Sequence, residues 1–98
     1  MKGILIEPGK EPVVTTLPEN LQGIEAWLGG PSTQKYFSRT PATLLHSAAG
    51  REPNRIWRGE VLCGVLLCYG WRGGRLQPLN KALQAELLDR LKDTEVRV

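Results

Sequence analysis

Residues 61–69 read Val-Leu-Cys-Gly-Val-Leu-Leu-Cys-Tyr, and this stretch decides the fold. It is rich in β-forming side chains and is apolar at both alternating sets of positions, which is typical of a strand that is covered on both faces. It is also much shorter than the roughly 20 apolar residues that a transmembrane helix needs. The sequence therefore predicts a central strand over residues 61–69, with the remaining elements arranged around it.

The elements before this strand follow from turn residues and from apolar spacing. Residues 2–7 and 12–17 predict two strands that form a hairpin around Pro8 and Gly9. Residues 19–28 predict a helix that Gly29 and Gly30 end. Its apolar face is predicted to comprise Leu21, Ile24, Trp27 and Leu28.

The segment between this helix and the central strand is less regular. Residues 34–39 and 42–48 predict two short strands on either side of Thr40 and Pro41, and residues 49–54 predict a loop. Ile56 and Trp57 predict the start of another extended segment.

After the central strand, residues 70–75 predict a glycine-rich turn, which is either a hairpin tip or a corner between a strand and a helix. Asn80 is the predicted N-cap of a second helix that runs to about Lys92, and residues 93–98 are predicted to form a frayed tail. The apolar stripe of this helix comprises Leu83, Leu87, Leu88 and Leu91. Together these elements predict an α+β fold: one small domain over residues 1–98, with a mixed, mainly antiparallel sheet of about five strands and two helices packed on it.

Three residues of the central strand carry further expectations. Cys63 and Cys68 are five positions apart, so they point to opposite faces of one strand and cannot bridge each other. They match no familiar zinc spacing, and both are expected to be buried and reduced. Gly64 is expected to mark a close approach of the helix predicted over residues 19–28, with its bulky Trp27.

The start of the chain bears on location. A single Lys precedes a short apolar stretch that Glu7, Pro8 and Gly9 interrupt, so the long apolar region and cleavage site of a signal peptide are missing. Reduced core cysteines fit a reducing compartment. The expected location is the cytoplasm.

The net charge of +3 is mild, but its distribution is uneven. Residues 1–30 carry a net charge of −2, residues 31–75 carry +5, and residues 76–98 are balanced. Six of the seven cations in the middle segment are arginines, and four aromatic residues are interleaved with them. Arg and Trp are favoured at partner-binding surfaces, because Arg has a fixed fork of donors and Trp a large rigid face.

Two short stretches therefore supply the candidate binding residues. These residues are Arg55, Trp57 and Arg58 in the first stretch, and Trp71, Arg72 and Arg75 in the second. The alternative for the first stretch is that Trp57 packs in the core and its arginines are solvated. For the second, the glycine-rich tip is expected to lift its three candidates away from the core.

Catalysis has little support in the sequence. His46 is the one histidine, and no carboxylate lies between Glu25 and Glu52 to orient it, so a structural histidine is expected. The Gly-rich stretch at residues 70–75 lacks the spacing of a phosphate-binding loop. We expect no catalytic residue, metal site or cofactor.

Four stretches resemble a family of small uncharacterised domains carried by phages and conjugative elements of Gram-positive bacteria. They are Met1–Lys10, Leu28–Gly30, Glu52–Arg55, which that family often reads as Pro-Pro-Asn-Arg, and the run over residues 59–70 with its leading Gly59 and Glu60. The resemblance covers about residues 1–90 and is poorest over residues 31–48. It implies a mobile-element accessory protein, with no activity or cofactor attached.

These observations favour a non-enzymatic accessory protein that binds an acidic macromolecule through its Arg and Trp surface. The expected partner is a host protein, for example a component of a defence or transfer system. One alternative is nucleic-acid binding, in which Arg neutralises phosphate and aromatic rings stack on bases, although +3 is a low charge for a dedicated DNA-binding protein. Another alternative is a small-ligand-binding protein.

Overall fold

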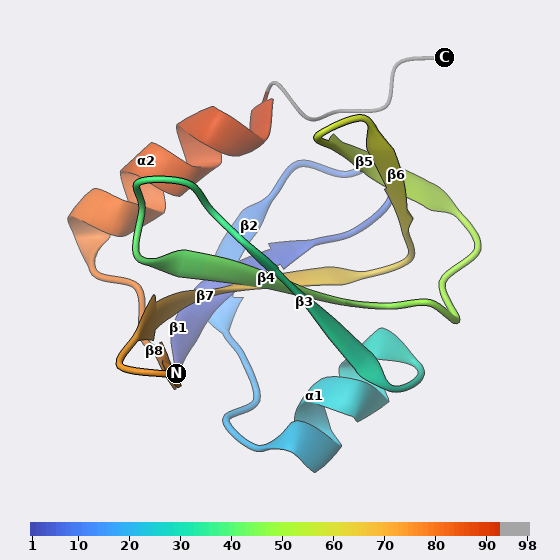
Figure 1. Cartoon of the computed structure of the whole chain (residues 1–98), viewed down its shortest axis with the longest axis horizontal. Helices are drawn as coiled ribbons and strands as arrows, with labels where there is room; N and C mark the ends of the chain where they lie inside the picture. The colour runs from blue at the N-terminus through green and yellow to red at the C-terminus, as the bar shows by residue number, and fades with distance from the viewer. Residues whose placement is uncertain (93–98) are drawn as a thin grey trace.

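The computed structural model describes residues 1–92 and has the predicted α+β class (Figure 1). The predicted tail at residues 93–98 lies outside the described residues. The elements are β1 (Lys2–Ile6), β2 (Val13–Thr16), α1 (Leu21–Leu28), β3 (Ser32–Tyr36), β4 (Ala42–Ser47), β5 (Pro53–Trp57), β6 (Glu60–Cys63), β7 (Leu66–Arg72), β8 (Arg75–Gln77) and α2 (Lys81–Lys92). Neither of these helices is long and apolar enough to cross a membrane.

Strand β7 is the centre of the larger sheet, whose order is β2-β1-β7-β4-β3. Strand β4 pairs with one edge of β7, while β1 and β8 share the other edge, β1 along Leu66–Cys68 and β8 along Gly70–Arg72. Strands β5 and β6 form a separate two-stranded sheet. Every pairing among the described strands is antiparallel. The large sheet has six strands, where about five were predicted.

The prediction of one strand over residues 61–69 is wrong, because the chain turns at Gly64. Its backbone has a φ of +78°, a conformation that side chains rarely permit. Residues on either side therefore belong to different sheets, β6 and β7, and only β7 is the buried central strand. The predicted neighbour of Gly64 is also wrong, since the group facing its Cα is the backbone of Gly50 and not helix α1.

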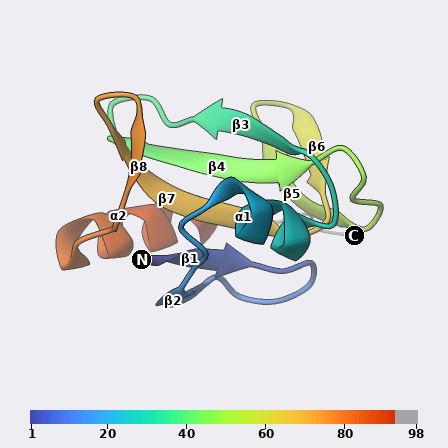
Figure 2. The same ribbon diagram turned by 90° about the horizontal axis from the view of Figure 1, so that it is seen from below.

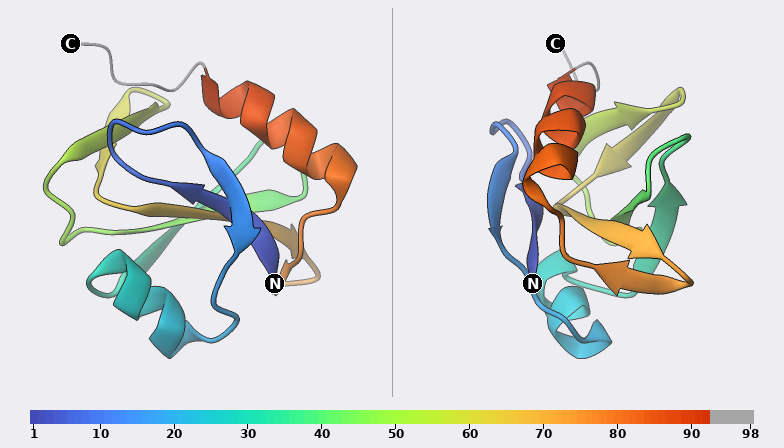
Figure 3. Two further views of the ribbon diagram at one scale, coloured as in Figure 1. Left: turned by 180° about the vertical axis from the view of Figure 1, so that it is seen from behind. Right: turned by 90° about the vertical axis from the view of Figure 1, so that its left-hand side faces the viewer.

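Alternate residues of β7 enter two separate cores. Leu66 and Cys68 pack with the apolar side of α2 and with Trp57 and Leu62 of the small sheet. Leu67 and Tyr69 pack on the other face with two residues of α1, Ile24 and Leu28. Figure 3 shows α2 beside the β1–β2 hairpin, and Figure 2 shows α1 near the start of β3. The helices therefore cover opposite faces of the large sheet.

Helix α2 begins as the sequence predicts, whereas α1 begins at Leu21, two residues after the predicted start. The side chains of Asn20 and Asn80 accept hydrogen bonds from the backbone N–H groups of Gly23 (2.7 Å) and Leu83 (2.8 Å), which caps α1 and α2. Gly29 ends α1 in the left-handed conformation, as predicted.

The predicted stripe of α1 is half wrong. Ile24 and Leu28 are buried, but the side chains of Leu21 and Trp27 are exposed, because this short helix covers only part of the sheet face. The stripe of α2 is confirmed: Leu87 and Leu91 are buried, and Leu83 and Leu88 pack against the same core.

The two cysteines differ in environment. Cys68 is fully buried in β7, and this burial raises the pKa of its thiol. Cys63 is partly exposed at the end of β6, so its predicted burial is wrong. Both are free thiols, and they lie in different sheets instead of on two faces of one strand.

Candidate functional site

The six candidate binding residues fall into two groups in the structure. Arg55 and Trp57 are buried in β5, so they are not part of an exposed binding surface. Arg58, Arg72 and Arg75 are exposed, and Trp71 is half-buried. Arg58, Arg72 and Arg75 are therefore accessible to a partner, whereas the expectation that Arg55 and Trp57 lie on the binding surface is wrong.

Arg55 joins the small sheet to the β1–β2 hairpin. Its guanidinium donates hydrogen bonds to the carbonyl oxygen of Lys10 (2.9 Å) and to both oxygens of Asn54 (2.8 and 2.9 Å). The Asn54 side chain in turn donates to the carbonyl oxygens of Ile6 (2.9 Å) and Gly64 (2.6 Å). A guanidinium held by these buried contacts supports the fold and is not available to a partner.

Trp57 is likewise part of the core. Its ring meets the ring of Phe37 edge to face, with centroids 4.9 Å apart. The guanidinium of Arg58 lies 5.4 Å from the centre of the Trp57 ring, and that of Arg90 lies 5.0 Å from the centre of the Phe37 ring. The buried aromatic pair thus supports an arginine on each ring.

Both of these arginines also contact the loop at residues 38–41, which connects β3 to β4. Arg58 donates to the Ser38 hydroxyl (2.8 Å) and to the Tyr36 carbonyl oxygen (3.3 Å). Arg90, from α2, donates to the carbonyl oxygen of Ser38 (3.0 Å) and to the Thr40 hydroxyl (2.8 Å). Two segments far apart in the sequence, the β5–β6 turn and the last turn of α2, therefore meet at this loop.

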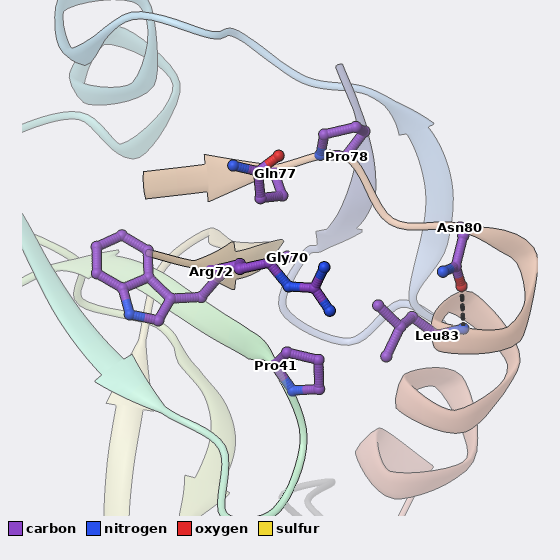
Figure 4. A pocket seen from close by; sticks show the side chains of 8 residues that line it. Pro41, Gly70, Arg72, Gln77, Pro78, Asn80 and Leu83 are labelled. Carbon is purple, nitrogen blue, oxygen red and sulfur yellow. Dashed lines mark hydrogen bonds between the residues drawn. The ribbon is translucent and has the colours of Figure 1, made fainter. Parts of the chain in front are cut away.

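Trp71 and Arg72 are neighbours in β7 and point to opposite faces of the sheet. The ring of Trp71 lies 5.7 Å from that of Tyr36, and its cross-strand partner Leu76 packs on the core under α1. Arg72 is directed to the α2 side, where it lines a pocket of about 200 Å³ with Pro41 and Leu83 among others. Figure 4 shows its guanidinium pointing between Pro41 and Leu83.

Arg75 lies directly opposite Arg72 across the β7–β8 hairpin. Like charges in this position repel each other across the strands. The turn between them consists of Gly73 and Gly74, both with positive φ, as in the tight two-residue turns that join hairpin strands. An anion bound beside the pair would remove this cost.

Arginines from four segments meet at the 38–41 loop and α2, and all of them except Arg90, which is partly buried, are exposed. Arg72 borders the pocket at Pro41, while Arg39 and Arg90 line the adjacent shallow pocket with Ser38, Thr40 and Glu86. We call this surface the basic seam and define it by five residues: Arg39, Arg58, Arg72, Arg75 and Arg90. Glu86 is the carboxylate that shares it, and its side chain accepts a hydrogen bond from the Thr40 hydroxyl (3.2 Å).

Two members of the basic seam are absent from the sequence-based set of candidates. Arg39 lies in the basic middle segment but outside the two stretches that supplied the candidates. Arg90 is in the C-terminal segment, whose charges balance. In the structure both Glu86 and Arg90 bind the Thr40 hydroxyl.

His46 lies in a second, smaller pocket of about 190 Å³, which Glu60 and Cys63 also line. The side chain is buried, and its Nε2 atom has no hydrogen-bond partner within residues 1–92. Burial, and next the charge of Lys35, lower the pKa of His46, while Glu60 opposes this shift. A neutral imidazole follows at neutral pH.

Neither this pocket nor any other part of residues 1–92 brings together three side chains suited to hold a metal ion. The exposed, clustered cations of the basic seam are the stronger candidate for a functional site. Comparison with protein-family models, with curated proteins and with solved structures found no match, so the geometry of this chain is the basis for its functional assignment.

Proposed function

We propose that this protein is a non-enzymatic binding protein that attaches to the acidic surface of another protein through the basic seam. The supporting observation is that four arginines from four separate segments meet around one loop and one helix, together with the carboxylate of Glu86, while Arg75 lies opposite one of them, Arg72, on the β7–β8 hairpin. Two arginines in direct cross-strand opposition add an unfavourable interaction that an acidic partner relieves.

The resemblance to domains of phages and conjugative elements makes a host protein the natural partner of such a surface. In this proposal the protein is an accessory factor of a mobile element and acts in the cytoplasm. A component of a host defence system is the kind of target that such a factor would inhibit by binding.

An acidic protein surface is favoured over single-stranded nucleic acid by the way the rings are placed. Nucleic-acid binding of that kind combines phosphate contacts with base stacking on one continuous surface. Here Trp71 lines the same pocket as Arg72, but its ring is already paired with that of Tyr36, with centroids 5.7 Å apart. The rings of Trp57 and Phe37 are already covered by arginines.

The proposal is tested by fluorescence anisotropy with three labelled probes: a short Glu-rich peptide, an oligothymidylate and a DNA duplex. We expect the peptide to bind the wild type, with affinity that falls as salt rises. The double variant Arg72→Glu/Arg75→Glu should weaken peptide binding by at least about tenfold, because each reversal converts an attraction into a repulsion.

The matched control is Lys10→Glu/Arg51→Glu, which changes the net charge by the same amount at exposed positions outside the basic seam. The control variant should bind the peptide like the wild type. Equal loss in both double variants would mean that only net charge matters, and the proposed surface would be wrong. Preference for either DNA probe over the peptide would replace this function with nucleic-acid binding.

Identification of the partner follows from a pull-down with mass spectrometry. A protein counts as the partner only if Arg72→Glu/Arg75→Glu loses it and the control variant retains it. If the wild type and both variants retain the same proteins, the basic seam is a solvated surface without a binding role.

A further inference from the structure

Three arginines of the basic seam surround one short loop. Arg58 and Arg90 bind Ser38 from opposite elements, the β5–β6 turn and helix α2, and Arg39 is the next residue in the loop itself. Arg39 is exposed and makes no hydrogen bond or ion pair with the rest of residues 1–92. The shallow pocket at this loop is open to a ligand on the protein surface.

The two contacting guanidinium groups are held in place and keep free donors. Arg58 uses only its Nη2 atom for the loop, and Arg90 only its Nη1 atom. The remaining nitrogen atoms of each group carry further N–H donors. Because both groups also stack on the rings of Trp57 and Phe37, their planes are fixed before any ligand arrives.

The backbone at two of these arginines is strained. Arg39 and Arg58 have φ values of 62° and 49°, and they are the two described residues other than glycine with positive φ. Glycine adopts this conformation without cost, whereas a side chain adds strain. At Arg58 the two-residue turn between β5 and β6 accounts for the positive φ, whereas Arg39 lies in the longer loop between β3 and β4. Strained residues such as Arg39 concentrate at functional sites, where the surrounding structure maintains them.

The net charge around the loop indicates which kind of anion it binds. Within residues 1–92, three guanidinium groups and one carboxylate, Glu86, give an excess of about two positive charges at the 38–40 loop. A phosphate monoester carries a charge of about −1.5 to −2 and three acceptor oxygens, whereas a carboxylate or a nucleic-acid phosphodiester carries a single charge. Arginine forks match phosphate oxygens in pairs.

We infer that the loop at residues 38–40 binds a phosphate monoester, and that a phosphorylated serine or threonine of the acidic partner protein provides it. This inference rests on the proposed function and adds to it a specific ligand group. Arg39, Arg58 and Arg90 bind the phosphate, while Arg72 and Arg75 contact acidic residues elsewhere on the partner.

The first experiment compares three versions of one Glu-rich labelled peptide, with phosphoserine, serine or glutamate at its centre. Anisotropy should show the phosphoserine peptide binding about tenfold more tightly than the other two, as expected for charge-assisted hydrogen bonds. Inorganic phosphate should compete weakly, since it lacks the contacts to Arg72 and Arg75. Equal affinity for the three peptides would overturn the phosphate inference while the proposed function stands.

The second experiment uses the strained backbone. Arg39→Gly removes a guanidinium and relieves the positive φ, so the variant should be at least as stable as the wild type in urea while its affinity for the phosphoserine peptide falls about tenfold. Arg51→Gly is the matched control, because Arg51 is exposed and its φ is not positive. The control variant should be slightly less stable than the wild type in urea and should bind the phosphoserine peptide with unchanged affinity.

The outcomes separate the two proposals. If Arg39→Gly gains stability and keeps its affinity for the phosphoserine peptide, the loop has no phosphate site. If Arg39→Lys fails to retain more affinity than Arg39→Gly, a role for the charge at this position is excluded. If no peptide binds and oligothymidylate does, both the phosphate inference and the proposed function fail.

Discussion

Gly50 and Gly64 approach each other so closely that a Cβ atom on Gly64 would lie 2.8 Å from the Cα atom of Gly50. The backbone N–H of Gly64 donates to the carbonyl oxygen of Glu52 (2.8 Å), which holds the loop after β4 against the turn between β6 and β7. This contact is where the apolar run divides between two sheets. The contact between Gly50 and Gly64 therefore fixes the position of the small sheet.

Gly64→Ala should lower the free energy of unfolding by about 2 to 4 kcal/mol, since it adds both a backbone clash and strain from the positive φ. Urea denaturation measures this change. Gly9→Ala is the control: Gly9 also has a positive φ, but a Cβ atom there meets nothing within 4 Å, so only about 1 to 2 kcal/mol should be lost. Equal losses in the two variants would show that the contact with Gly50 is unimportant.

Asn54→Ala should destabilise the protein by about 2 to 4 kcal/mol, because the carbonyl oxygens of Ile6 and Gly64 lose the amide that binds them.

Arg55→Ala should also be destabilising, while the folded protein keeps the affinity of the wild type for the Glu-rich peptide. Denaturation and anisotropy on the same samples check both statements. A specific loss of affinity in a fully folded Arg55→Ala variant would restore Arg55 to the binding site.

The free energy of unfolding should decrease as the pH falls below about 6.5, and His46 is the group responsible. The pKa of His46 is lowered in the folded state, so the unfolded chain takes up a proton first as the pH falls, and the folded state is then disfavoured. Urea midpoints at a series of pH values should show a smaller decrease for His46→Gln than for the wild type between pH 7 and 5. Parallel curves for the two proteins would mean that His46 binds its proton equally well in both states.

Thiol labelling of the native protein should modify Cys63 and spare Cys68. Cys63 is partly exposed, whereas Cys68 is fully buried and burial raises its pKa, which suppresses the reactive thiolate. Mass spectrometry should find one label per chain before unfolding and two in denaturant. Rapid native modification of Cys68 would contradict the central position of β7.

The sequence was informative wherever structure depends on near neighbours. Pro8 and Gly9 correctly predicted the first hairpin, and Gly29 correctly predicted the end of α1, because turns and helix ends require particular backbone angles. Asn80 correctly predicted the start of α2 for a similar reason. The apolar run over residues 61–69 correctly predicted a buried central strand but not its length, since glycine within such a run is compatible with either a strand or a turn.

The sequence by itself determined the α+β class, the two helices and the basic character of the middle of the chain, because these follow from apolar spacing, capping residues and charge count. Only the tertiary structure decided which arginines are available. Arg55 and Arg58 belong to the same short stretch of the sequence, yet Arg55 is buried against Lys10 and Asn54 while Arg58 lies on the surface beside Ser38. Burial depends on contacts between residues distant in the sequence, and no local pattern specifies them.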